Sequence, residues 1–138
     1  MTKAYTSYLS EISLLNDKDI SEEKQKIYDK LTELFESYSE RIYNIFYNNA
    51  VEHDLFFYIG EFKVSCNKIR KDDNNNFLDK KLPFYGFYED NCDWKQIFYY
   101  EIDTVNETQS FMISDHIDEM NKFLARLYNA IIEYNYYE

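Results

Sequence analysis

Apolar residues recur every three or four positions between residues 27 and 45, a spacing that predicts a long amphipathic helix with one buried stripe. The residues of this stripe are Ile27, Leu31, Leu34, Tyr38, Ile42 and Ile45. Asp19 or Ser21 can cap the start of the helix, and the Asn48-Asn49 pair predicts its end. A weaker pattern of the same period over residues 3–15 predicts a shorter helix before it.

A second clear helical pattern covers residues 114–134. Ser114 can act as its N-cap, and the acidic residues that follow suit the positive end of the helix dipole. The face that we expect to be buried carries Ile117, Met120, Leu124, Leu127 and Ile131.

Strand-forming residues replace the helical period after the long helix. Residues 54–66 predict a first strand, because aromatic residues come first and Phe62, Val64 and Cys66 then alternate with other residues. The polar run over residues 71–76 is too hydrophilic to be packed and predicts a loop.

Two further strands are predicted over residues 84–89 and 95–103. Pro83 can start the first of them, since the first position of a strand tolerates a missing amide hydrogen. Only a short polar turn from Asp90 to Asp93 separates the two strands, and this favours a hairpin.

The predicted order of elements is therefore α-α-β-β-β-α, which indicates the α+β class. We expect an antiparallel three-stranded meander packed by the N-terminal helices and a long C-terminal helix. No internal repeat and no Pro/Gly-rich linker interrupts the pattern, so residues 1–138 predict a single acidic domain. With the helices on one face of the sheet, the other face is expected to carry exposed aromatic residues.

Composition narrows the class of protein. Hydrophobic residues make up 45% of the chain and aromatic residues 20%, which excludes an intrinsically disordered chain. An AT-rich coding sequence would also raise Tyr, Phe and Asn, so the aromatic content has two explanations. The same bias would raise Lys as well, and it therefore leaves the excess of Asp and Glu unexplained.

The net charge of −11 argues against direct binding to nucleic acid or to an anionic membrane, since both require basic residues to neutralise phosphates. It favours a basic protein partner instead. No apolar run is long enough to span a membrane, and the two cysteines follow no disulfide framework. These features predict a cytoplasmic protein.

The sequence carries no recognisable catalytic or cofactor motif. Only two glycines are present, so an ordinary phosphate-binding loop is not expected. The four residues that zinc would need are His53, Cys66, Cys92 and His116, and they lack the close pairs typical of structural zinc sites. We therefore predict no enzyme activity, no cofactor and no metal.

Charge is concentrated in one part of the sequence. Residues 83–121 contain nine acidic residues and one basic residue, Lys95, and aromatic residues are interspersed among them. Outward-facing aromatic residues ringed by carboxylates are what an interface with a basic protein needs. The candidate partner-binding residues are Tyr88, Glu89, Asp90, Asp93, Trp94, Tyr99, Glu101 and Asp103. The alternative interpretation is a solvated acidic face over an aromatic core.

Three functions fit these features. The leading hypothesis is an immunity protein or antitoxin that neutralises a basic, nuclease-type toxin by occluding its active site. The alternative is a phage or mobile-element anti-defence protein that mimics nucleic acid and inhibits a restriction or RNA-guided nuclease. The third is a small enzyme or a small-ligand-binding protein with an aromatic pocket, which predicts a concave site with convergent polar groups.

Overall fold

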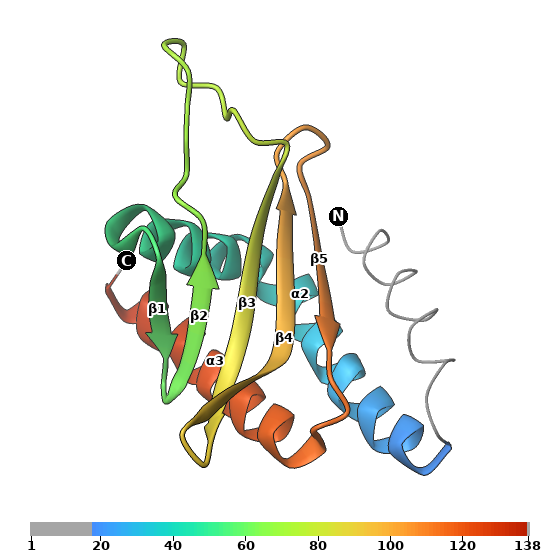
Figure 1. Ribbon diagram of the computed structural model, residues 1–138. Coiled ribbons are helices and arrows are strands. Elements are labelled where there is room, and N and C mark those ends of the chain that lie inside the picture. The colour runs from blue at the N-terminus through green and yellow to red at the C-terminus, as the bar shows by residue number, and fades with distance from the viewer. Residues whose placement is uncertain (1–17, 138) are drawn as a thin grey trace.

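The computed structural model describes residues 18–137, and within them the chain forms two helices and one five-stranded antiparallel sheet (Figure 1). The elements are α2 (Lys18–His53), β1 (Phe56–Ile59), β2 (Phe62–Cys66), β3 (Lys81–Asp90), β4 (Asp93–Asp103), β5 (Thr108–Ile113) and α3 (Ile117–Tyr137). The α+β class is confirmed. The helix predicted over residues 3–15 lies outside the described residues.

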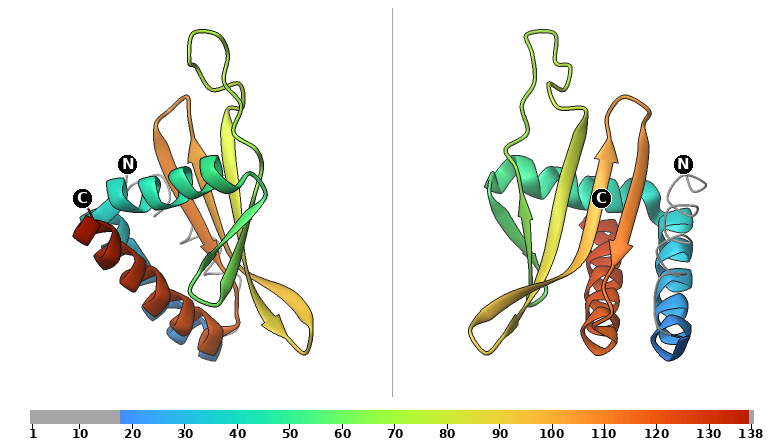
Figure 2. Two further views of the ribbon diagram at one scale, coloured as in Figure 1. Left: turned by 90° about the vertical axis from the view of Figure 1, so that its left-hand side faces the viewer. Right: turned by 45° about the vertical axis from the view of Figure 1, so that its right-hand side comes forward.

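The strands follow one another across the sheet in chain order, and each pairs antiparallel with the next. Both helices lie against the same face of this sheet (Figure 2). The predicted β3–β4 hairpin is confirmed, and Asn91 and Cys92 form its turn with positive φ angles of 53° and 73°. The prediction of three strands is wrong, however, because the meander has five.

One of the extra strands comes from residues 54–66, which form a hairpin rather than a single strand. Gly60 sits in the connecting turn with a φ of +59°, where a residue with a side chain is disfavoured. A Cβ atom at this position would lie 2.6 Å from Cδ of Arg126 on α3. The turn and the close approach of α3 therefore both require glycine.

The other extra strand is β5, which the sequence pattern did not predict. Its burial alternates along the strand, with Gln109, Phe111 and Ile113 turned toward the helices. A polar residue at the first of these inward positions breaks the apolar alternation that identifies a half-buried strand. Tyr100 compensates for the burial of Gln109, since its hydroxyl donates a hydrogen bond of 2.7 Å to Gln109 Oε1.

Helix α2 begins at Lys18, before both predicted caps, and extends four residues beyond Asn49. It bends at Tyr38, whose φ of −133° and ψ of 31° are not helical. Figure 2 shows that the part after the bend turns across the sheet. Gln109 Nε2 donates a hydrogen bond of 3.4 Å to the Ser39 carbonyl at this point, so a buried side chain of β5 supports the bend.

Helix α3 begins three residues later than predicted. Ser114 lies just before it, and its hydroxyl oxygen accepts a hydrogen bond of 3.2 Å from the His116 amide. The predicted apolar face is buried at Met120, Leu127 and Ile131, and it also includes Phe123, which the prediction omitted.

The core between the helices and the sheet is built from aromatic rings. Phe35 stacks on Phe111 with ring centroids 4.8 Å apart, and Phe46 lies 4.5 Å from Tyr100. These rings come from the two halves of α2 and from strands β4 and β5, so the core joins both halves of the bent helix to the sheet. The predicted stripe of α2 is buried at Ile27, Leu31, Ile42 and Ile45 and partly buried at Leu34 and Tyr38.

Replacing Gly60 with alanine should destabilise the fold by about 1–2 kcal/mol, because an L-residue is strained at this positive φ. The contact with Arg126 adds to this cost. Urea unfolding of Gly60→Ala in the wild-type and Arg126→Ala backgrounds separates the two contributions, since the second lacks the contacts with Cγ and Cδ of Arg126 and keeps only the approach to Cβ at 3.1 Å beside the backbone strain. Equal stability of Gly60→Ala and wild type would contradict the role assigned to this turn.

Candidate functional site

One face of the sheet is turned away from both helices, and we call it the outer face (Figure 2). No element within residues 18–137 covers it. Its side chains are the half-buried or exposed members of the strands, whereas their neighbours in sequence are buried against the helices. The outer face includes Phe56, Tyr58, Lys63, Ser65, Tyr85, Phe87, Glu89, Trp94, Tyr99, Glu101, Asp103, Ser110 and Met112.

At one end of the outer face, aromatic side chains surround Lys63. Its Nζ atom lies 4.6 Å from the ring centroid of Phe56 and 5.5 Å from that of Trp94. Phe56 packs edge to face on Tyr58, and the exposed fractions of Phe56, Tyr58 and Trp94 are 41%, 54% and 39%. The cation–π contacts order the rings of Phe56 and Trp94 while leaving much of their area exposed to solvent.

The centre of the outer face combines aromatic rings with a carboxylate. Tyr85 and Tyr99 lie opposite each other on β3 and β4, with ring centroids 5.2 Å apart. The Tyr99 hydroxyl donates a hydrogen bond of 2.6 Å to Glu101 Oε1, and Lys81 Nζ lies 3.5 Å from Glu101 Oε2. Glu101 is therefore oriented by its neighbours rather than left to move independently.

A β-bulge decides which of the predicted residues share this face. The register shifts between Gly86 and Phe87, so that Ile97 and Phe98 are both buried in succession. Without this shift, Trp94 and Tyr99 would point to opposite sides of the sheet, since they are five residues apart. The bulge brings both onto the outer face.

The structure thus brings five of the eight candidate residues onto the outer face: Glu89, Trp94, Tyr99, Glu101 and Asp103. Tyr88 points the other way, and its hydroxyl lies 3.4 Å from Nδ1 of His116. Asp90 and Asp93 pair with each other in register at the tip of the β3–β4 hairpin. Lys95 Nζ forms an ion pair of 2.7 Å with Asp90.

The acidic residues between positions 83 and 121 do not gather on one face, contrary to the expectation from their proximity in sequence. They occupy the β3–β4 hairpin (Glu89, Asp90, Asp93), β4 (Glu101), the β4–β5 turn at the opposite end of the sheet (Asp103, Glu107) and the start of α3 (Asp115, Asp118, Glu119). Asp115, two residues before α3, forms an ion pair of 2.9 Å with the buried Lys24 of α2. Several of these carboxylates therefore have structural roles.

Asp103 is one such residue, because it organises the β4–β5 turn. Its carboxylate accepts hydrogen bonds from the amides of Val105 and Asn106 at 3.0 and 2.9 Å, and from Asn106 Nδ2 at 3.0 Å. The hydrogen bond from the Asn106 amide contributes most to lowering the pKa of Asp103 below its ordinary value. The ionised carboxylate of Asp103 is thus the form that these hydrogen bonds of the turn stabilise.

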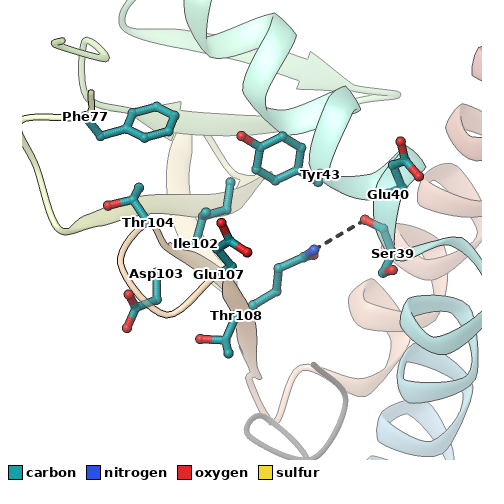
Figure 3. Close-up of a pocket in the computed structure, with 10 residues that line it drawn as sticks. Ser39, Glu40, Tyr43, Phe77, Ile102, Asp103, Thr104, Glu107 and Thr108 are labelled. Carbon is teal, nitrogen blue, oxygen red and sulfur yellow. Dashed lines mark hydrogen bonds between the residues drawn. The ribbon is translucent and has the colours of Figure 1, made fainter. Parts of the chain in front are cut away.

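A cavity of about 440 Å³ lies between the bend of α2 and the β4–β5 turn (Figure 3), and we call it the kink pocket. Its lining residues are Ser39, Glu40 and Tyr43 from α2, Phe77 from the loop before β3, and Ile102, Asp103, Thr104, Glu107, Thr108 and Gln109 from the last two strands and their turn. The sequence had selected only Asp103 among them. The pocket depends on the bend of α2, and residues 18–53 contain no proline or glycine to predict it.

The residues considered for metal or thiol chemistry lie apart. Cys66 is buried on β2, and burial raises the pKa of its thiol above the ordinary value, whereas Cys92 is exposed at the β3–β4 turn. In the part of the chain that the structure describes, no three His, Cys, Asp or Glu side chains converge as metal ligands would. Neither α2 nor α3 is both long and apolar enough to cross a membrane.

Asp103→Ala should lower the free energy of unfolding at pH 7, and this deficit should shrink as the pH falls toward 3. The lowered pKa means that the carboxylate stabilises the fold above the pH at which the unfolded side chain titrates, about 4, and that this contribution is lost on acidification. Chemical denaturation across this pH range measures the deficit. Asp103→Asn is the control, since it keeps an acceptor oxygen without the charge. A deficit for Asp103→Ala that is the same at pH 3 and pH 7 would exclude the carboxylate charge as its source.

Comparison of the chain with protein-family models, with curated proteins and with solved structures found no match in any of the three.

Proposed function

We propose that this chain is a non-catalytic binding protein that docks a basic protein on its outer face. The observation that carries the proposal is the row of aromatic side chains on a sheet face that no other described element covers. Exposed apolar patches of this kind mark interaction sites in soluble proteins. Phe56, Tyr58 and Trp94 would supply the contact area, and Tyr99 would extend it toward the centre of the sheet.

The net negative charge of the molecule favours a basic protein as the partner. A net charge of −11 produces a long-range negative potential that accelerates association with a basic protein and disfavours acidic ones. On the outer face itself, Glu89 and Glu101 stand next to Trp94 and Tyr99 and can orient basic side chains of the partner. Steering would come from the whole molecule, and short-range affinity from the aromatic rings.

We further propose that the partner is a nuclease-type toxin and that the chain acts as its immunity protein or antitoxin. A nuclease active site is basic because its substrate is a polyanion, and it also accommodates stacked bases. On the outer face, the carboxylates resemble the phosphates of that substrate, and the aromatic rings resemble its stacked bases. Occlusion of the toxin's active site would then neutralise it.

The alternative role as a nucleic-acid mimic against a restriction or RNA-guided nuclease requires carboxylates spaced along a surface as phosphates are. The acidic residues of this chain are divided among several places, and on the outer face they are separated by aromatic rings. This arrangement supports the toxin-binding proposal better. The third hypothesis, a small enzyme or a small-ligand-binding protein, predicts a concave site, and the kink pocket is a cavity that such a function could use.

Trp94→Ala should weaken partner binding by about 2 kcal/mol, roughly 30-fold in the dissociation constant, because a large aromatic anchor is lost. The experiment captures the tagged chain's partner from its native cells, purifies it and measures its affinity for each variant. Tyr128→Ala is the matched control, since Tyr128 is a similarly exposed aromatic residue on α3. Weaker binding of Tyr128→Ala with unchanged binding of Trp94→Ala would place the interface elsewhere. A captured partner that is not basic, or that keeps its activity in the complex, would exclude the inhibitory role.

Glu89→Lys and Glu133→Lys change the net charge equally and therefore separate local from global electrostatics. Both substitutions should slow association at low salt, because both weaken the long-range potential. Only Glu89→Lys should also speed dissociation, since Glu133 is an exposed residue of α3, and this helix lies on the other side of the sheet from the outer face. Stopped-flow kinetics at two salt concentrations distinguishes these effects. Identical dissociation rates for the two variants would show that Glu89 is not in the interface.

A further inference from the structure

The kink pocket has the composition of a site for an organic cation. Three of its ten lining residues are acidic (Glu40, Asp103 and Glu107), and none is basic. Tyr43 and Phe77 form aromatic walls, and Ile102 adds an apolar surface. A cation with an apolar stem matches such a lining, because the rings and the carboxylates attract the charge while the apolar surface covers the stem.

The carboxylates differ in what they can do. The Asp103 carboxylate is occupied by the β4–β5 turn, as described above, and Figure 3 shows it pointing away from the other lining side chains. The Glu107 carboxylate points back toward Ile102 and Tyr43 in the same view. Glu107 has a positive φ of 56°, so the turn that Asp103 organises also sets the direction in which this side chain leaves the backbone. Glu107 is therefore the carboxylate placed to meet a ligand.

One of the two aromatic walls, Phe77, already contacts a cation of the protein itself. Lys71 Nζ lies 4.7 Å from the ring centroid of Phe77 and 5.5 Å from that of Tyr47. Tyr47 in turn stacks on Tyr43 with centroids 5.5 Å apart. The same group of rings thus holds an ammonium group within the fold, an observation independent of the acidic residues of the pocket.

None of the ten lining residues is basic, and the ammonium group of Lys71 is engaged with the rings of Phe77 and Tyr47. Burial is the main cause that raises the pKa of Tyr43, so its hydroxyl is neutral at physiological pH and can accept or donate a hydrogen bond. Gln109 donates to the Ser39 carbonyl and accepts from Tyr100, and both interactions tie it to the protein. The ligand would consequently meet Glu107, Tyr43 and Phe77.

We propose that the kink pocket binds a guanidinium or alkylammonium group. Two sources share this chemistry: a free organic cation, and an Arg or Lys side chain of another protein. The pocket lies between α2 and the inward side of the sheet and shares only Asp103 with the outer face, so this site does not depend on the function proposed for that face.

The test uses n-butylguanidinium as the probe and its neutral isostere n-butylurea as the chemical control, with binding followed by NMR chemical shifts of the full chain. The guanidinium should bind with a dissociation constant on the order of 1–10 mM, as expected for so small a ligand, and the urea should not. Glu107→Gln should weaken binding about tenfold through loss of a charge-assisted contact. Glu133→Gln, which removes an equal charge from α3, should leave it unchanged.

Tyr43→Leu and Tyr43→Phe form a second pair of variants. The first removes an aromatic wall and should weaken binding, and the second keeps the ring and should retain most of the affinity. Circular dichroism confirms that each variant is folded, and Tyr43→Phe with Glu107→Gln keeps the test informative if Tyr43→Leu fails to fold. An absence of saturable shifts, equal binding of n-butylurea, or equal weakening by Glu107→Gln and Glu133→Gln would overturn the proposal.

A short arginine-containing peptide with blocked ends identifies the source of the cation. Tighter binding of the peptide than of n-butylguanidinium indicates a side chain of another protein, and exclusion of the peptide indicates a free organic cation. Both results support the site, because the recognised group is the same. None of these measurements involves a protein partner, so a negative result here leaves the outer-face proposal untouched, and the reverse also holds.

Discussion

The placement of both helices on one face of the sheet is the constraint on which the rest of this structure depends. Successive side chains of a strand point to opposite faces of the sheet, and an apolar face must be covered by another layer. Here the helices within residues 18–137 cover only one face. The inward residues meet this layer with an aromatic core in which Phe35 and Phe46 of α2 contact Phe111 and Tyr100. The outward residues are nevertheless also rich in aromatics. Packing of this one-sided core does not account for that second set of rings, and this is why the outer face is the natural candidate for an interface.

The same constraint explains the bend of α2 and, with it, the kink pocket. A straight helix of 36 residues would be about 54 Å long. The longest strand, β4, has 11 residues and spans only about 36 Å. The helix must therefore bend if both of its halves are to remain on the sheet, and it does so at Tyr38. The bend leaves a space beside the β4–β5 turn, where Gln109 supports the Ser39 carbonyl and the kink pocket forms.

The parts of the fold that could be predicted are those with a strong local signal. The apolar stripe of α2, the helical face of α3 and the β3–β4 hairpin depend on spacing and turn chemistry, and each was found close to its predicted position. The division at Gly60 and the strand β5 were missed for physical reasons. A two-residue turn inside a run of strand formers resembles a continuous strand, and Gln109 satisfies its buried polar group through Tyr100, a partner nine residues away.

Prediction of the candidate site reached a similar limit. Alternation along a strand indicates which residues share a face only when the register is unbroken, and the bulge at Ile97 reverses the pattern between Trp94 and Tyr99. Tyr88 and the outward Glu89 are consecutive residues of β3, so ordinary alternation places Tyr88 on the helix side near His116, and the two could not both have belonged to the outer face. The kink pocket required contacts between residues up to 70 positions apart, such as Gln109 with Ser39, and no local pattern encodes these.

The acidic character of the chain divides into two physically different contributions. Asp103, Asp115 and Glu101 are bound to the turn, to Lys24 and to Tyr99, so these carboxylates already have partners within the fold. The net charge acts at long range and is screened beyond roughly 8–10 Å at physiological salt. For the basic partner that we propose, it would therefore govern the rate of association rather than the rate of dissociation. Residence time must come from desolvated contact area, and on the described surface the outer face, with Phe56, Tyr58 and Trp94, offers that area together with neighbouring carboxylates.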